Sequence, residues 1–274
     1  MARTAFIIPV AIGTMVISAW LSPLSQAQSF WLDQRGEKLV SIELLKPRLD
    51  GGGTTLASSA VFFAGRFPIG QGISVAAELP LSHFGYESSF ASESHTAVGN
   101  PYVGLRMRSS SSPWQAAFGV RLPLASDENP GLITGLNADF DRFEAFTPEL
   151  SAIQFDVNYL FEHPSGFSTS VRAAPSIMIP ARESGGDTEL FIAYSAMGWQ
   201  RHGRVRAGAG MSGRLLASQP GLSIEERSVH QLGLSVIGTF GSVQPGLHFR
   251  LPVDEEFSRF VDYVIGMNVA VLLK

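Results

Sequence analysis

The chain has 274 residues, no cysteine, 28 glycines, a formal net charge of −4 and only 16% charged residues. The lack of cysteine excludes disulfides and thiolate metal sites, and the negative charge disfavours a nucleic-acid binder. The charged fraction is too low to solvate the surface of a soluble protein of this size. No linker divides the chain, so we expect one domain after the N-terminal segment.

The N-terminus has the features of a secretory signal peptide. Met1–Arg3 is short and basic, an apolar run interrupted by a proline follows, and Ser25-Gln26-Ala27 provides a small-residue cleavage site. A permanent membrane anchor is the alternative, but the apolar run is short for one. We therefore predict a signal peptide over residues 1–27 and an outer-membrane β-barrel domain over residues 28–274. No later apolar run could form a spanning helix, so insertion must use strands.

Alternation of apolar and polar residues with a period of two continues through most of the mature chain. In the last strand, Val269 and Val271 share an apolar face, while Asn268 and Ala270 lie on the other. This pattern is typical of strands that meet lipid on one side and water on the other. The expected strands are residues 40–44, 61–67, 73–81, 103–107, 114–124, 153–161, 171–179, 190–199, 205–215, 232–240, 247–251 and 261–273. The segment 190–199 is the weakest, and its two faces cannot be assigned.

The connections between these strands alternate in length, which indicates an all-β, transmembrane, antiparallel up-and-down barrel of about 12 strands. Short turns belong at the periplasmic end and longer loops outside. Aromatic residues next to the short turns predict an inner girdle of Phe67, Trp114, Phe161, Trp199 and Phe240. A soluble β-sandwich or lipocalin-like barrel also alternates, but its polar face would be rich in Lys and Glu. Here that face carries Gly, Ser, Gln, Asn and Arg, as a barrel interior would.

The longest interruption, Ser126 to Glu149, changes to a helical period. Leu132, Leu136 and Phe140 follow helical spacing, and Asp139 lies away from that apolar stripe. We predict a short helix in an extracellular loop. It would cap the pore mouth, fold inward as a constriction, or shield the rim.

The polar face of the strands carries the candidate functional residues. The charged groups expected to line the lumen are Glu43 together with Arg66, Glu78, Arg106, Arg108, Arg121, Asp156, Arg172, Arg206, Arg214, His248, Arg250 and Asp262. Two interpretations stay open: the charges satisfy one another across the interior, or the surplus of arginine biases a narrow pore toward anions or orients an amphiphilic solute.

Three motifs suggest other chemistry without the context that it needs. Residues 208–213 match the dinucleotide pattern G-x-G-x-x-G, but the strand alternation runs straight through them, so we interpret them as small residues on a strand. His230 near Ser228 is the only arrangement that suggests a hydrolase on the outer wall, and a histidine at the rim is the simpler interpretation. Asp139-Phe-Asp141 lacks a calcium-loop pattern, so we expect a solvated acidic face there.

Two short motifs resemble a family of bacterial outer-membrane barrels described as transporters or meta-pathway phenol-degradation proteins. They are residues 78–82, Glu-Leu-Pro-Leu-Ser, and residues 98–106, Val-Gly-Asn-Pro-Tyr-Val-Gly-Leu-Arg. The resemblance implies passage of small, apolar or aromatic compounds. The chain departs from the usual barrel ending, because it closes on Leu273-Lys274 and not on an aromatic residue.

Together these features predict a passive channel or diffusion transporter for small solutes in the bacterial outer membrane. The alternative is a structural, adhesive or receptor-like barrel with a plugged lumen. We expect no enzymatic activity, no cofactor, no metal site and no nucleic-acid partner. The expected partners are outer-membrane lipid, the barrel assembly machinery and a small-molecule solute.

Overall fold

The structure is a computed structural model that describes residues 29–32, 38–49, 58–87, 92–109, 112–181, 186–219 and 221–274. The predicted signal peptide and its cleavage site lie outside the described residues. The strands are β1 (Leu39–Leu49), β2 (Ser59–Gly70), β3 (Ile73–Glu87), β4 (Ser92–Val98), β5 (Tyr102–Arg108), β6 (Trp114–Arg121), β7 (Leu150–Glu162), β8 (Phe167–Pro180), β9 (Glu189–His202), β10 (Val205–Leu216), β11 (Ser228–Gly238), β12 (Val243–Pro252) and β13 (Val261–Leu272). The helices are α1 (Leu132–Ala138), the 3-10 helix η1 (Phe140–Ala145), α2 (Ile224–Arg227) and α3 (Glu255–Ser258).

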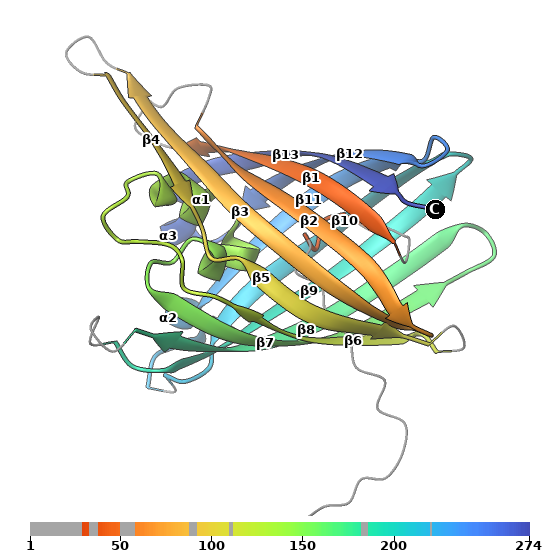
Figure 1. Cartoon of the computed structure of the whole chain (residues 1–274), viewed down its shortest axis with the longest axis horizontal. Coiled ribbons are helices and arrows are strands. Elements are labelled where there is room, and N and C mark those ends of the chain that lie inside the picture. Colours follow the sequence, from red (N-terminus) through yellow and green to blue (C-terminus); the bar gives the residue numbers. More distant parts are fainter. Residues whose placement is uncertain are drawn as a thin grey trace, which may run out of the picture.

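The strands form a closed antiparallel barrel (Figure 1). β1 pairs with both β2 and β13, and β2 also pairs with β3, so the sheet has no open edge there. β4 and β5 both pair with β3, at its two ends, and together act as one barrel strand interrupted at residues 99–101. The barrel therefore has twelve strand positions, which confirms the predicted fold class.

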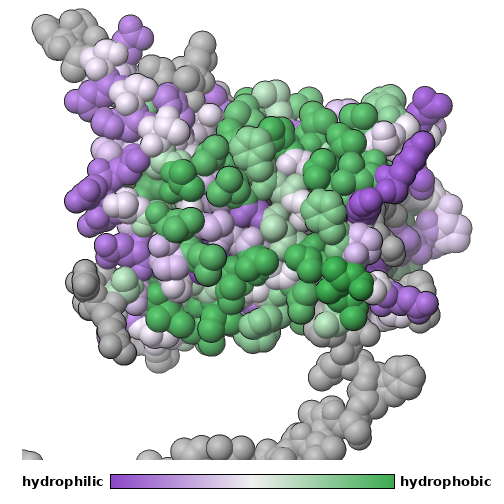
Figure 2. All heavy atoms as spheres, viewed as in Figure 1, coloured by the Kyte–Doolittle hydropathy of each residue, from purple (hydrophilic) through white to green (hydrophobic). Residues whose placement is uncertain are grey.

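The outer surface of the barrel is apolar and the inner surface is polar. Leu234 and Leu247 point outward and are 61% and 56% exposed, while Ser235 and His248, their neighbours in the chain, are buried inside. Figure 2 shows the resulting apolar zone across the middle of the face in view, with hydrophilic residues gathered toward the two ends. This arrangement inverts that of a soluble protein and suits a wall that faces lipid.

The two ends of the barrel differ as the connection lengths predict. β1 begins and β13 ends at the short-turn end, where the Lys38 ammonium donates to the backbone carbonyl of Lys274 at 2.8 Å. α1, η1, α2 and α3 all lie in connections at the long-loop end (Figure 1). No helix among the described residues is both long and apolar enough to cross a membrane.

The short helix predicted for the long loop is present as α1, and η1 follows it because the backbone leaves the helical region at Asp139 (φ −139°, ψ 87°). One sequence expectation needs correction. Trp199 does not join the predicted aromatic girdle at the short-turn end: its side chain is buried inside the barrel with Met197. The faces of β9 could not be assigned from sequence because its inward face is apolar as well as its outward one.

Candidate functional site: the filled lumen

The loop between β6 and β7 folds into the barrel, so the inward-folding alternative is the one observed. Its charged turn, residues 139–144, contains four buried ionisable side chains: Asp139, Asp141, Arg142 and Glu144. Apolar packing holds the flanks of this turn, since Leu132 of α1 and Phe146 belong to one buried cluster that includes Phe62 of the barrel wall. The turn itself meets the wall through polar and ionic contacts.

Arg142 lies at the centre of these contacts. Its guanidinium donates to Glu43 Oε2 at 2.6 Å, to Glu78 Oε2 at 2.7 Å and to Asp139 Oδ2 at 2.6 Å. The same group lies 3.7 Å from the centre of the Phe62 ring, within the range of a cation–π interaction. One arginine from the loop therefore pairs with two carboxylates of the wall, on β1 and β3, and Glu78 also accepts from Arg121 Nη2 at 2.7 Å.

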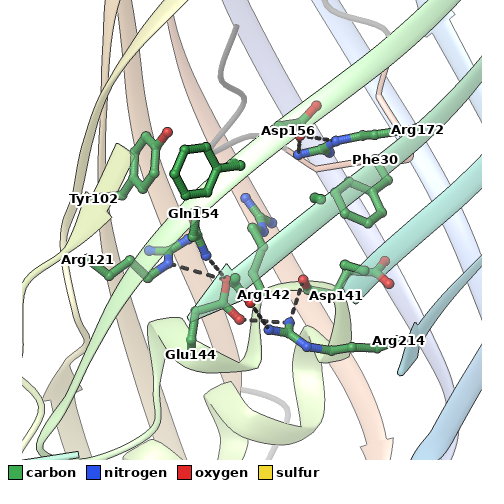
Figure 3. Close-up of a pocket in the computed structure, with 14 residues that line it drawn as sticks. Phe30, Tyr102, Arg121, Asp141, Arg142, Glu144, Gln154, Asp156, Arg172 and Arg214 are labelled. Atoms are coloured by element: carbon green, nitrogen blue, oxygen red, sulfur yellow. Dashed lines mark hydrogen bonds and ion pairs between the residues drawn. The ribbon is translucent and has the colours of Figure 1, made fainter. Parts of the chain in front are cut away.

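Two carboxylates of the charged turn, Asp139 and Glu144, pair with arginines of the wall. Arg250 Nη1 donates to Asp139 Oδ1 at 2.8 Å, and Arg214 Nη1 donates to Glu144 Oε2 at 2.7 Å. Arg121 forms a longer ion pair with Glu144, at 3.6 Å. Figure 3 shows Arg121 and Arg214 reaching Glu144 from different strands of the barrel. The charged turn is thus attached to the wall on several sides.

The electrostatic environment differs among the three carboxylates of the charged turn. Burial opposes the ionisation of Asp139 and Glu144, but the guanidinium groups beside them outweigh it and lower both pKa values. Burial, and next the negative charge of Asp139, raise the pKa of Asp141. Asp141 is instead held mainly by neutral donors, including the Ser212 hydroxyl at 2.7 Å.

A second segment of the chain enters the lumen from near the N-terminus. Trp31 is fully buried, and its indole Nε1 donates to Asp141 Oδ2 at 2.8 Å. Trp31 and Leu32 pack with Met197, Trp199 and Ile237, on the inner faces of β9 and β11. Phe30 covers the guanidinium of Arg172, 3.8 Å from its ring centre. The N-terminal segment and the charged turn therefore meet inside the barrel.

Glycines of the wall provide the room for these large side chains. A Cβ at Gly233 would lie 2.5 Å from the Trp31 ring, and one at Gly208 would lie 2.5 Å from the Trp199 ring. The G-x-G-x-x-G match at residues 208–213 is thus explained by packing, since a Cβ at Gly210 would collide with the Met197 sulfur at 2.3 Å. The prediction that these are small residues on a strand agrees with their place in β10.

The structure brings only some of the predicted lumen residues together. Arg121, Arg214, Arg250 and Glu78 contact the charged turn directly, and His248 contacts Glu43 at 3.1 Å. The Asp156 carboxylate accepts from Arg172 apart from the turn. Arg66 and Arg106 are buried near the short-turn end, Arg206 is half-buried there, and Arg108 is exposed.

Two sequence predictions about acidic residues are wrong. Asp262 does not line the lumen: its side chain is 50% exposed and lies 3.9 Å from Arg48 on the outer face. The β1–β13 register shifts beside it, with Arg48 opposite Tyr263 and Leu49 opposite Val261, and this irregularity turns Asp262 outward. The Asp139-Phe-Asp141 motif is not a solvated face either, because both carboxylates are buried and paired.

Sequence reasoning missed Trp31 and Arg142. Trp31 follows the predicted cleavage site closely, where strand periodicity has not yet begun. Arg142 is the single basic residue among the acidic residues of the charged turn, a signal that pointed to internal pairing. Neither residue lies on a strand, so the alternation that located the lumen face could not include them.

Two cavities lined by described residues differ in size. Between the charged turn, Phe30 and the wall, a space of about 30 Å³ lies among Arg121, Arg172 and Arg214 (Figure 3). It has room for water but not for a solute. At the short-turn end, a larger cavity of about 260 Å³ is lined in part by Arg201, Arg204 and Arg206. Among the described residues, the space beside the charged turn is therefore too small for a solute, and a larger cavity bordered by arginines lies at the short-turn end.

The His230 region does not form a serine–histidine pair. His230 Nε2 lies 2.6 Å from the Tyr194 hydroxyl, and Nδ1 lies 3.1 Å from Asp254 Oδ1. The Ser228 hydroxyl donates instead to the Ile224 carbonyl at 2.6 Å. In the described ranges, no group of three or more His, Asp or Glu residues could bind a metal ion.

Known proteins resemble this chain in fold alone. No family model and no curated protein matches the chain. Among solved structures, an outer-membrane channel from Pseudomonas putida F1 is similar at a TM-score of 0.60 and 7% identity, covering 91% of this chain and 100% of that one. The NanC porin (TM-score 0.51, 7% identity, 86% and 100% coverage) and the β domain of the Bordetella autotransporter BrkA (0.51, 10%, 86% and 100%) are also similar. The chain thus has the fold of bacterial outer-membrane barrels, and the phenol-degradation-like family stays a resemblance.

Proposed function

We propose that this chain is a passive channel for small solutes in the bacterial outer membrane, closed in the present structure by its own charged turn and N-terminal segment. The apolar outer surface and the shared barrel fold support the location. The observation that carries the channel role is the chemistry of the closure: the charged turn, residues 139–144, meets a polar wall through ion pairs and hydrogen bonds.

This kind of closure is reversible at a modest free-energy cost. Buried ion pairs carry a large desolvation penalty, and much of it is recovered when the charges return to water. An apolar plug would instead lose about 25 cal/mol for each Å² of surface that became exposed. Leu132 and Phe146 anchor the flanks of the turn by apolar packing, so opening can be confined to the charged turn between them and to the N-terminal segment. The N-terminal segment adds an apolar cost, because Trp31 and Leu32 pack against the wall.

A permanently plugged barrel with a structural, adhesive or receptor-like role is the competing proposal. The small mid-height cavity of about 30 Å³ favours it. The polar wall behind the charged turn does not, because a permanent plug would gain more stability from an interface that was apolar there as well.

Solute flux through vesicles separates the two proposals. Protein refolded into liposomes should admit small solutes, and deletion of residues 129–146 should raise the rate without changing heat-modifiable migration, which reports the folded barrel. Equal impermeability of both folded forms would reject the channel and favour the plugged barrel.

A further inference from the structure

Three arginines of the wall converge on the carboxylates of the charged turn. Arg121, Arg214 and Arg250 come from β6, β10 and β12, and all three are almost completely buried. Their partners in the turn are Glu144 and Asp139. The closed lumen is thus already a site in which arginines hold carboxylates away from water.

The charged turn leaves part of this binding capacity unused. Arg250 donates through its two terminal nitrogens, to Asp139 Oδ1 and to the Ala138 carbonyl, and Arg214 likewise donates through Nη1 and Nη2. Among the described residues, the buried Nε atoms of Arg214 and Arg250 have no hydrogen-bond acceptor, and that of Arg121 has only the ion pair with Glu144 at 3.6 Å. The terminal nitrogens of Arg121 donate to the wall, to Asn100 and Glu78. A free carboxylate could approach side-on and accept from Nε and one terminal nitrogen together, which is the stronger two-point geometry.

The charge of the wall favours the same kind of ligand. Its buried Arg, Asp and Glu side chains in the described part of the chain are six arginines and three carboxylates, which leaves a surplus of three positive charges. The charged turn offsets this surplus with three carboxylates and one arginine. Displacement of the turn would therefore leave a cationic wall that lines the lumen, on which an anion replaces the lost negative charge.

We propose that the solute of this channel is a small anion with two or more carboxylates, which binds Arg121, Arg214 and Arg250 in place of Asp139 and Glu144 and so holds the lumen open. The inference rests on the channel function proposed above. The charged turn acts as an internal mimic of the solute, and the two compete for one set of guanidinium groups. Binding and opening are consequently linked, because the solute favours only the state from which the turn has left.

Citrate in divalent-free buffer is a suitable probe, with inorganic phosphate and the neutral succinamide as comparisons. Planar-bilayer recordings of the refolded mature chain should show an open fraction that rises with citrate and does not respond to succinamide. In the form without residues 129–146, where no turn competes for these guanidinium groups, Arg214→Gln and Arg250→Gln should each raise the citrate concentration for half-maximal binding by about tenfold, a loss of about 1.4 kcal/mol in binding. Arg108→Gln, at an exposed position near the short turns, should leave that concentration unchanged.

Arg214→Lys is the control for a loss of response that is caused only by misfolding. It keeps the charge but not the two-point geometry, so it should fold and still lose most of the citrate response. An unchanged citrate response in Arg214→Lys and Arg214→Gln would overturn the assigned site. Equal opening by phosphate would overturn the carboxylate class.

The deletion of residues 129–146 distinguishes failure of this inference from failure of the channel function. If the deleted form conducts but citrate has no effect on the full chain, the solute assignment fails and the channel stands. If neither form conducts, the channel function fails, and the solute assignment falls with it.

Discussion

Trp31 and Asp141, 110 positions apart in the chain, are joined inside the barrel by a hydrogen bond of 2.8 Å from the indole Nε1 to Oδ2. The bond links the N-terminal segment to the charged turn, residues 139–144. Asp141 also accepts from the Ser212 hydroxyl, so the same carboxylate ties both segments to β10. Closure of the lumen is therefore shared, and weakening one segment should loosen the other.

Replacement of Trp31 by Phe tests this coupling. The change keeps an aromatic ring against Trp199 but removes the donor to Asp141, which should destabilise the closed state by about 1–3 kcal/mol because a buried acceptor loses a partner. We expect a several-fold higher open fraction in bilayer recordings. Trp114→Phe, on the outer surface and 55% exposed, is the matched control and should have no effect on opening. Indistinguishable recordings from Trp31→Phe and the original chain would refute the coupling.

Arg142→Ala should open the lumen most strongly of the single substitutions. It leaves Glu43 and Glu78 without the guanidinium that both accept from, and breaking a buried ion pair in this way costs about 3–5 kcal/mol. Conductance and thermal unfolding of the refolded protein both report the change. Arg259→Ala removes an exposed pair with Glu255 and should alter neither reading measurably. A closed, fully stable Arg142→Ala protein would contradict the central role of this residue.

The closure should resist mild acid and fail in strong acid. Asp139 and Glu144 have lowered pKa values in the seated turn, so their stabilising contribution is present above their ordinary pKa values of about 4 and is lost as the pH falls through the lower, seated values. Asp141 has the opposite sign, because its raised pKa lets the seated turn bind a proton more readily. We expect an open fraction that stays constant or falls slightly from pH 7 to 5 and rises below about pH 4.

Bilayer recordings across this pH range show whether protonation of each carboxylate raises or lowers the open fraction. Asp141→Asn should remove any slight tightening between pH 7 and 5 and leave the opening in strong acid intact. Opening already between pH 7 and 5 would mean that the ion pairs of Asp139 and Glu144 do not hold the turn.

The assigned lipid-facing surface can be tested by placing an arginine on it at two depths in the membrane. Leu234 points outward near the middle of β11, so Leu234→Arg should destabilise the inserted barrel by about 2–4 kcal/mol. Phe260, 65% exposed beside the long-loop end, should tolerate the same change at about 0–1 kcal/mol. Urea-dependent folding into vesicles measures both. Equal tolerance at the two positions would show that Leu234 does not face lipid.

The barrel wall could be predicted from sequence because its signal is local. Each residue of β11, from Gln231 to Ile237, lies on the face that simple alternation assigns to it. The same rule failed on β9, where Trp199 turns inward to meet Trp31, a residue far away in the chain. It also failed at Asp262, because a shift in strand register cannot be recognised from composition.

Only the wall residues of the candidate site could be predicted from the sequence, for a related reason. The arginines of the wall stood out by their period, but their partners come from a loop that has no period of its own. A helical stripe indicated that the loop was structured. Its three possible positions, over the pore mouth, inside the lumen or along the rim, differ only in long-range contacts such as that between Arg142 and Glu43. Such pairings become evident only when the barrel is closed.

Single-channel conductance of the refolded mature chain, with and without residues 129–146, tests the central claim most directly. The account predicts rare, brief openings in the full chain and a stable, larger, anion-selective conductance after the deletion, because the cationic wall is then exposed. Silence from both forms, in bilayers shown to contain the inserted barrel, would contradict the channel and leave a permanently filled barrel.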